Sequence, residues 1–227
     1  MEQSNLNRPW LIRRSVQQWL TVVGYLLVWI LIGVFSQNVS LVVGAWLLLG
    51  GFGLWLLVVL WWQKPLANYS LKQVLWPAFA WGGAIVTVEV VFILAVYLAS
   101  RGTNANLVQN TNQLVLMVKQ MPLVAVYILV IAPILEELVF RVSLFERLVN
   151  VFHWFLGGTT RFHKSLIAVA ALVTALLFAQ VHSGIILPQY VLISLILQYL
   201  YCHYRNPWVN IFAHIGLNFL TLGFLLV

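Results

Sequence analysis

Three carboxylic acids stand inside long apolar runs of this 227-residue sequence, which contains five glutamates and no aspartate. They are Glu89, Glu136 and Glu137, whereas Glu2 lies in a polar tail and Glu146 near the end of a run. An acidic side chain at the centre of a membrane helix costs about 2.5 to 3.5 kcal/mol, so such groups face the protein interior and usually have a function. These three residues are therefore the first candidates for chemistry.

The adjacent pair Glu136 and Glu137 is the sharper signal. Glu137 and Arg141 are four residues apart, so on a helix they share a face and can form an ion pair. Glu136 points about 100° away from Glu137 and is left without a helical partner. A carboxylate in that position can accept a proton from water and pass it on. The alternative is a Glu137–Arg141 pair that only locks helix packing, but packing does not require a second glutamate.

Two later apolar runs carry histidine. His182 ends one run, four residues after Phe178, and His214 shares a helix face with Asn218, four residues further on. Each of these residues alone is typical of a hydrogen bond between membrane helices. Together with the carboxylates they form a polar set on three apolar helices, and chemistry or transport would explain burying so much polarity.

The reaction that this set favours is amide hydrolysis without a covalent nucleophile. A carboxylate and a histidine can activate a water molecule, and a histidine with an asparagine can donate hydrogen bonds to an oxyanion. Two histidines and a glutamate can also bind Zn²⁺, but the HExxH spacing of soluble zinc proteases is absent. The sequence therefore requires no metal or other cofactor, and zinc stays an alternative. A Ser–His–Asp triad is excluded because aspartate is missing.

Composition places these residues in a membrane protein. The chain is 63% hydrophobic and 7% charged, whereas a soluble domain is about 45–50% apolar and about 25% charged. The apolar runs are continuous and lack the alternation of a membrane β-barrel, which predicts an all-α transmembrane bundle. The net charge of +7 comes from residues scattered through short loops, so it indicates membrane topology and not nucleic-acid binding. The single cysteine excludes an intramolecular disulfide.

We predict seven transmembrane helices in one integral membrane domain. Residues 1–121 hold the first three spans and a long polar loop, and residues 122–227 form a predicted catalytic core with four more. Nine Lys and Arg residues fall on the side of the N-terminus and two on the other, which predicts a cytoplasmic N-terminus. The predicted spans cover approximately residues 17–36, 41–62, 74–99, 122–150, 165–182, 185–203 and 208–227.

Three short motifs on successive late helices resemble the signatures of the CPBP family. They are EExxxR beginning at Glu136, FxxxH ending at His182 and HxxxN beginning at His214. This family comprises the CAAX prenyl proteases together with bacteriocin-processing and immunity proteins, and is also called the Abi family. The resemblance covers about Pro122–Val227, roughly the second half of the chain.

The resemblance implies a role for each motif residue. Glu136 would be the base that activates water, assisted by His182. His214 and Asn218 would form the oxyanion site. The supporting residues would be Glu137, Arg141 and Phe178, and no metal is implied.

The leading functional hypothesis is therefore a membrane-embedded endopeptidase of the bacterial plasma membrane. Its expected partners are the lipid bilayer and a peptide or protein substrate that is prenylated or anchored to the membrane. Peptide processing and bacteriocin immunity are the expected biological roles. Two alternatives remain: a non-catalytic immunity or scaffold protein on the same fold, and a proton-coupled transporter that uses Glu89 of the third span.

Overall fold

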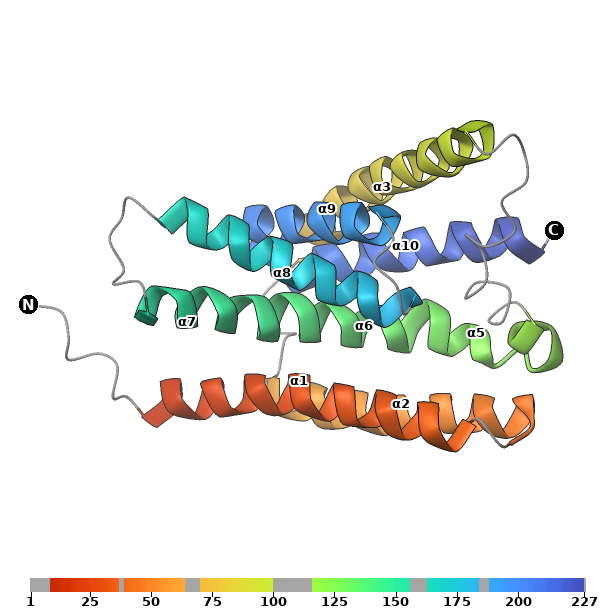
Figure 1. Ribbon diagram of the computed structural model, residues 1–227, viewed down its shortest axis with the longest axis horizontal. Helices are drawn as coiled ribbons and strands as arrows, with labels where there is room; N and C mark the ends of the chain where they lie inside the picture. Colours follow the sequence, from red (N-terminus) through yellow and green to blue (C-terminus); the bar gives the residue numbers. More distant parts are fainter. Residues whose placement is uncertain are drawn as a thin grey trace, which may run out of the picture.

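The computed structural model of the protein describes residues 9–36, 39–63, 70–99, 116–155, 163–183 and 188–226. Every regular element within these ranges is a helix, so the predicted all-helical fold class is confirmed. Most of the helices lie nearly parallel to one long axis and are stacked in layers, as Figure 1 shows.

The first two helices form the layer at the bottom of Figure 1. They are α1 (Pro9–Ser36) and α2 (Leu41–Gln63), which pack along each other. A helix that is apolar around its whole circumference, as α2 is, contacts lipid on one side and protein on the other. Some of the polar groups of this layer bond to one another. Gln63 Nε2, for example, donates to Thr21 Oγ1 at 2.8 Å.

A single long helical segment, here called the central helix, runs without interruption from Val124 to Phe155. Its α-helical parts alternate with two wider π-helical stretches, which often occur at functional sites. Pro133 explains the first stretch, because proline has no N–H to donate and its ring clashes with the carbonyl one turn earlier. The parts are α5 (Val124–Val126), η2 (Tyr127–Ile131), α6 (Ala132–Glu137), η3 (Leu138–Phe145) and α7 (Glu146–Phe155).

Three helices of the C-terminal region cover the other side of the central helix. They are α8 (His163–Ser183), α9 (Pro188–Tyr204) and α10 (Pro207–Leu226). The third helix of the chain, α3 (Leu71–Ala99), packs along α10 and forms the outer edge at the top of Figure 1. The central helix therefore lies between the α1–α2 layer and the C-terminal helices. Residues 132–145 of the central helix are mostly buried.

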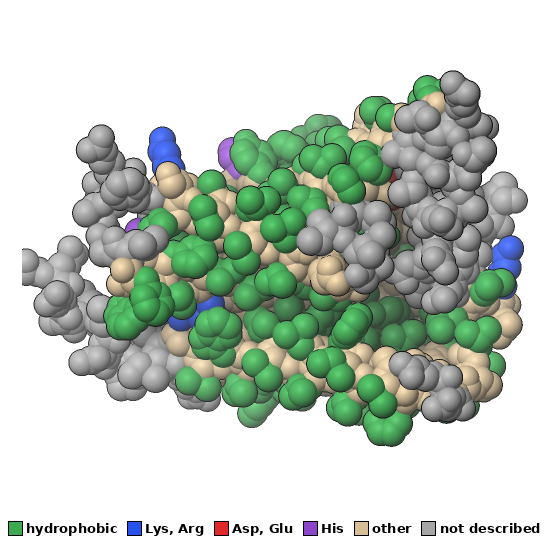
Figure 2. All heavy atoms as spheres, viewed as in Figure 1, with side chains coloured by type: hydrophobic (Ala, Val, Ile, Leu, Met, Phe, Trp, Pro, Cys, Tyr) green, Lys and Arg blue, Asp and Glu red, His purple; other side chains and the backbone are tan. Residues whose placement is uncertain are grey.

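Four helices are long and apolar enough to cross a membrane by length and composition. They cover Arg14–Ser36, Leu41–Gln63, Leu71–Phe92 and Lys164–His182. Figure 2 shows hydrophobic side chains over most of the visible face, with Lys and Arg toward its ends, as expected for a surface in lipid. The other three predicted spans also form helices, namely the central helix, α9 and α10. The count of seven spans and the cytoplasmic N-terminus stay predictions.

Candidate active site

The antiparallel packing of the central helix and α8 brings Glu136 beside His182. Glu136 lies as many residues before the end of α7 at Phe155 as His182 lies after the start of α8 at His163. The two side chains therefore reach the same level, and the distance from Glu136 Oε2 to His182 Nε2 is 3.5 Å.

His214 of α10 completes the surroundings of the same carboxylate oxygen. Its Nε2 atom lies 3.6 Å from Glu136 Oε2, and its Nδ1 atom lies 3.0 Å from Glu137 Oε1. Glu136 and His214 are buried, with side-chain exposures of 9% and 4%, whereas the His182 side chain is 20% exposed. The site is thus enclosed by protein except on the side of His182.

Glu137 holds the second histidine and is itself held from two sides. Arg141 Nε lies 3.2 Å from Glu137 Oε2, and Asn210 Nδ2 donates to the same oxygen at 3.1 Å. The predicted i,i+4 ion pair between Glu137 and Arg141 is therefore present, with both side chains fully buried. The Arg141 guanidinium also lies 4.9 Å from the centre of the Phe178 ring, a cation–π contact.

Backbone and carboxylate acceptors determine which imidazole nitrogens face Glu136. His182 Nδ1 lies 2.8 Å from the carbonyl oxygen of Phe178, which can only accept, so Nδ1 carries the hydrogen. By the same reasoning His214 Nδ1 donates to the Glu137 carboxylate. In the neutral rings, both Nε2 lone pairs therefore point toward Glu136 Oε2.

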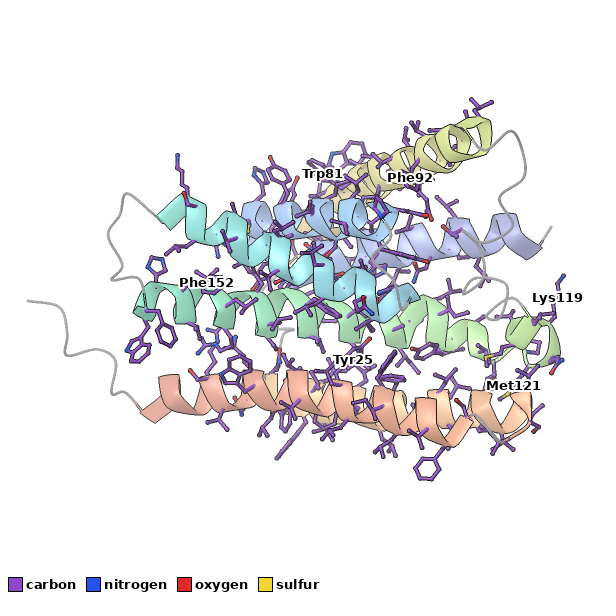
Figure 3. All side chains as sticks on the ribbon, in the orientation of Figure 1. Tyr25, Trp81, Phe92, Lys119, Met121 and Phe152 are labelled. Atoms are coloured by element: carbon purple, nitrogen blue, oxygen red, sulfur yellow. The ribbon has the colours of Figure 1, made fainter. Side chains whose placement is uncertain are left out.

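Stacked aromatic rings fix the orientation of His182. The Phe178 ring lies 4.0 Å from the His182 ring in a stacked arrangement, and Phe140 meets Phe178 edge-on at 5.2 Å. On the other side, Tyr25 of α1 packs against Phe140 at 6.0 Å. Figure 3 shows Tyr25 between α1 and the central helix. The α1–α2 layer thus packs against the aromatic rings that hold His182 in place.

Asn218 lies one helical turn beyond His214 and contacts the first π-helical stretch. Its Nδ2 atom donates to the carbonyl oxygen of Ile128 at 2.9 Å. The local backbone explains this bond: the N–H of Ala132 donates to Tyr127 O, and Pro133, the next residue, has no N–H to offer to Ile128. Asn218 therefore satisfies a backbone carbonyl that the proline leaves without a donor.

Asn210 is a site residue that the sequence reasoning missed. It is fully buried on α10, and its Nδ2 atom also donates to Leu197 O at 2.5 Å. A signal was present, because Asn210, His214 and Asn218 follow one another at four-residue steps and so lie along one helix face. The motif HxxxN begins at His214, so it does not include Asn210 one turn earlier.

Glu89 lies at the edge of this site on α3. Its Oε1 atom accepts from Gln189 Nε2 at 3.0 Å, and its Oε2 atom accepts from Thr221 Oγ1 at 3.0 Å. The carboxylate thus joins α3 to α9 and α10. Within the described parts of the chain, no group of three His, Cys, Asp or Glu side chains is arranged to hold a metal ion.

Fold and site together define a helical membrane protein with a buried carboxylate–histidine centre. Residues 118–220 match the family described as type II CAAX prenyl endopeptidase, Rce1-like. This match confirms the predicted resemblance to the CPBP family for the second half of the chain.

A bacterial relative gives a distant match. Over 111 residues the chain is 27% identical to the "Putative membrane peptidase YdiL" of Bacillus subtilis (strain 168). The alignment covers 48% of this chain and 40% of that protein, so the chain matches less than half of the relative's length. No solved structure matches the chain.

Proposed function

We propose that this protein is a membrane-embedded endopeptidase in which Glu136 activates the hydrolytic water. The observation that carries the proposal is the position of Glu136 Oε2, which faces Nε2 of His182 at 3.5 Å and Nε2 of His214 at 3.6 Å. These separations exceed an ordinary hydrogen bond, and a water molecule can contact a carboxylate and an imidazole that face each other across such a distance. The family match of residues 118–220 and the name of the bacterial relative support the same reaction class.

The reaction begins with transfer of a proton from water to Glu136. The water oxygen forms a bond to the carbonyl carbon of the peptide, and His182 holds the water through its Nε2 lone pair. Glu136 then passes the proton to the amide nitrogen, the C–N bond breaks, and a carboxylic acid and an amine leave. This sequence needs no covalent intermediate.

The oxyanion of the tetrahedral intermediate would be stabilised by His214 and Asn218. The Asn218 amide has two hydrogens, of which one is used on Ile128 O and fixes the side chain, while the second can bind the oxyanion. His214 can donate from Nε2 only when it is also protonated there. The buried centre holds two carboxylates and one guanidinium, which together carry a charge of −1. One proton shared by Glu136 and the histidines brings the net charge of the centre to zero.

Glu137, Arg141 and Asn210 would position the reacting groups. Glu137 fixes the His214 ring through Nδ1, and Arg141 and Asn210 fix Glu137. Preorganised groups of this kind raise catalysis because they need no rearrangement when charge develops. The proposed substrates are peptides or proteins anchored in or near the bacterial plasma membrane, with prenylated C-termini as one class. Peptide processing and bacteriocin immunity are the roles proposed for this reaction.

Cleavage by the purified full chain in liposomes tests the proposal. A quenched fluorescent peptide is incubated with wild type and with Glu136→Gln, which keeps the side-chain shape and removes the base. We expect the rate to fall about 10³-fold in the variant, the upper range for a general base. The variant should insert and purify like wild type. Unchanged cleavage in Glu136→Gln would refute the mechanism.

A chelator distinguishes the metal-dependent alternative. We expect the wild-type rate to persist after treatment with a strong Zn²⁺ chelator. Loss of activity that is restored by Zn²⁺ alone would instead assign the histidines and Glu136 to metal binding. Immunity to a bacteriocin that persists in Glu136→Gln would favour the scaffold alternative.

A further inference from the structure

Glu89 is a carboxylate in an apolar helix that the proposed reaction does not use. Its side chain is partly buried, and each oxygen accepts one hydrogen bond, from Gln189 and from Thr221. The three residues come from α3, α9 and α10, so three separate helices converge on this carboxylate. Such convergence around an intramembrane acid indicates a built site, since the insertion cost of the acid opposes its presence there.

The Glu89 cluster borders the proposed reaction centre on two sides. Thr221 lies seven residues after His214, and therefore on the same face of α10. Gln189 precedes Tyr190, whose ring lies 5.1 Å from the ring of His182. A peptide held at Glu136 would therefore have neighbouring residues within reach of Glu89.

Within the described residues, Glu89 lacks the arginine partner that two other carboxylates have. Glu137 pairs with Arg141 and Glu146 with Arg14. Among the residues that the structure describes, Glu89 forms no ion pair, and both of its hydrogen-bond donors are neutral. Neutral donors orient a carboxylate but do not supply the positive charge that an ionised acid in an apolar environment requires. A cation from outside the chain would supply it.

We propose that Glu89, oriented by Gln189 and Thr221, is a substrate subsite that binds the cationic side chain of a lysine or arginine near the scissile bond. This inference rests on the proposed peptidase function. The charge-assisted hydrogen bond would form only with the right substrate, so Glu89 determines specificity and takes no part in the proton transfers at Glu136.

The test uses pairs of quenched peptides that differ only in one charge. A lysine is placed in turn at each position flanking the scissile bond, and its partner peptide carries acetyl-lysine there. At one position we expect wild type to prefer the lysine peptide about 10- to 100-fold in kcat/KM, the range of a charge-assisted hydrogen bond. In Glu89→Gln this ratio should fall to about 1. The control Glu146→Gln, at the start of α7 and hydrogen-bonded to Tyr201 near the end of α9, should keep the wild-type ratio.

Binding to an inactive protein separates this inference from the proposed function. Affinities of the same peptides for Glu136→Gln, and for Glu136→Gln combined with Glu89→Gln, should show the same preference and its loss. Cleavage by wild type without any lysine preference would overturn the subsite and leave the peptidase standing. A lysine preference in binding without cleavage by wild type would overturn the peptidase and leave the subsite standing. The absence of preference in both measurements would overturn the subsite.

Discussion

Two glutamates on the central helix have opposite surroundings. Glu146, toward its end, is directly hydrogen-bonded at both oxygens: Gln18 Nε2 donates to Oε2 at 2.8 Å and the Tyr201 hydroxyl to Oε1 at 2.5 Å. Arg14 adds an ion pair at 3.3 Å. Glu136, in the middle, faces two imidazole nitrogens at 3.5 and 3.6 Å. The carboxylate of Glu146 is therefore saturated, meaning that both of its oxygens accept direct hydrogen bonds. The carboxylate of Glu136 is open, meaning that it faces its neighbours beyond the distance of an ordinary hydrogen bond.

The difference separates a structural carboxylate from one that can react. A carboxylate whose lone pairs are already engaged cannot take a proton from water without losing those bonds, whereas an open one beside a base-bearing ring can. Glu137, next to Glu136, belongs to the saturated kind because His214, Arg141 and Asn210 all contact it. Neighbours in sequence thus have different surroundings, because Glu136 faces His182 of α8 whereas Glu137 contacts Arg141 and Asn210.

Arg141→Met should have the largest effect on stability and cleavage, because it leaves Glu137 without its cation. Arg141 and Glu137 are fully buried, and removing one partner of a buried pair costs about 3 to 5 kcal/mol. We expect the free energy of unfolding in mixed micelles to fall by about that amount, together with loss of cleavage. Restoring neutrality with Glu137→Gln in the same chain should recover part of the stability. Equal stability of Arg141→Met and wild type would show that the pair does not hold the core.

His182→Asn tests whether the imidazole beside Glu136 assists proton transfer. It removes the Nε2 atom that faces Glu136 while keeping a polar side chain at the end of α8. We expect kcat to fall about 10²-fold, the lower range for a group that assists proton transfer, with the melting temperature little changed. His203→Asn, at an exposed position of α9, is the matched control. A similar loss of kcat in both variants would count against a specific role for His182.

Sequence reasoning identified most of the site because polar residues in apolar runs are expensive and therefore rare. Glu136, His182 and His214 were all found by this criterion, and the structure brings them together. Their common depth was harder to predict. A fourth helix that continues to Asn150 puts Glu136 near mid-depth, whereas the spans predict His182 near the outer end of the next helix. In the structure the helix continues to Phe155, and Glu136 lies beside His182. Helix ends in amphipathic turns are poorly marked in sequence.

The π-helical stretches could not be predicted from sequence patterns. An α-helical register gives Ile128 O a backbone donor at Ala132, and only the widened turn before Pro133 removes that donor. The consequence is the hydrogen bond from Asn218, whose predicted place was beside an oxyanion. Asn210 was missed for a different reason: buried asparagine is common in membrane helices as a hydrogen-bonding partner, so one more on α10 carried little information.

Asn210→Leu tests whether cleavage depends on the hydrogen bond that Asn210 donates to Glu137. Leucine has the same branching, with bulkier methyl groups, and removes both bonds of the amide, to Glu137 and to Leu197 O. With one bond fewer, Glu137 holds His214 less firmly, and we expect kcat/KM to fall about tenfold. Asn210→Asp, which keeps the shape but places a second acid beside Glu137, should be worse than leucine because like charges repel. Full activity in both variants would remove Asn210 from the site.

Glu146→Gln should have the smallest effect, because the saturated carboxylate serves the fold. Glutamine can keep a hydrogen bond to Tyr201 but loses the ion pair with the half-exposed Arg14. Exposed ion pairs contribute little, and hydrogen bonds between membrane helices average about 0.6 kcal/mol, so we expect stability to fall by about 1 kcal/mol. Cleavage should stay within about threefold of wild type, since general acid–base groups account for losses of about 10²-fold or more. A loss comparable to that of Glu136→Gln would mean that saturation by direct hydrogen bonds does not separate the two roles, and the assignment of Glu136 would lose its physical basis.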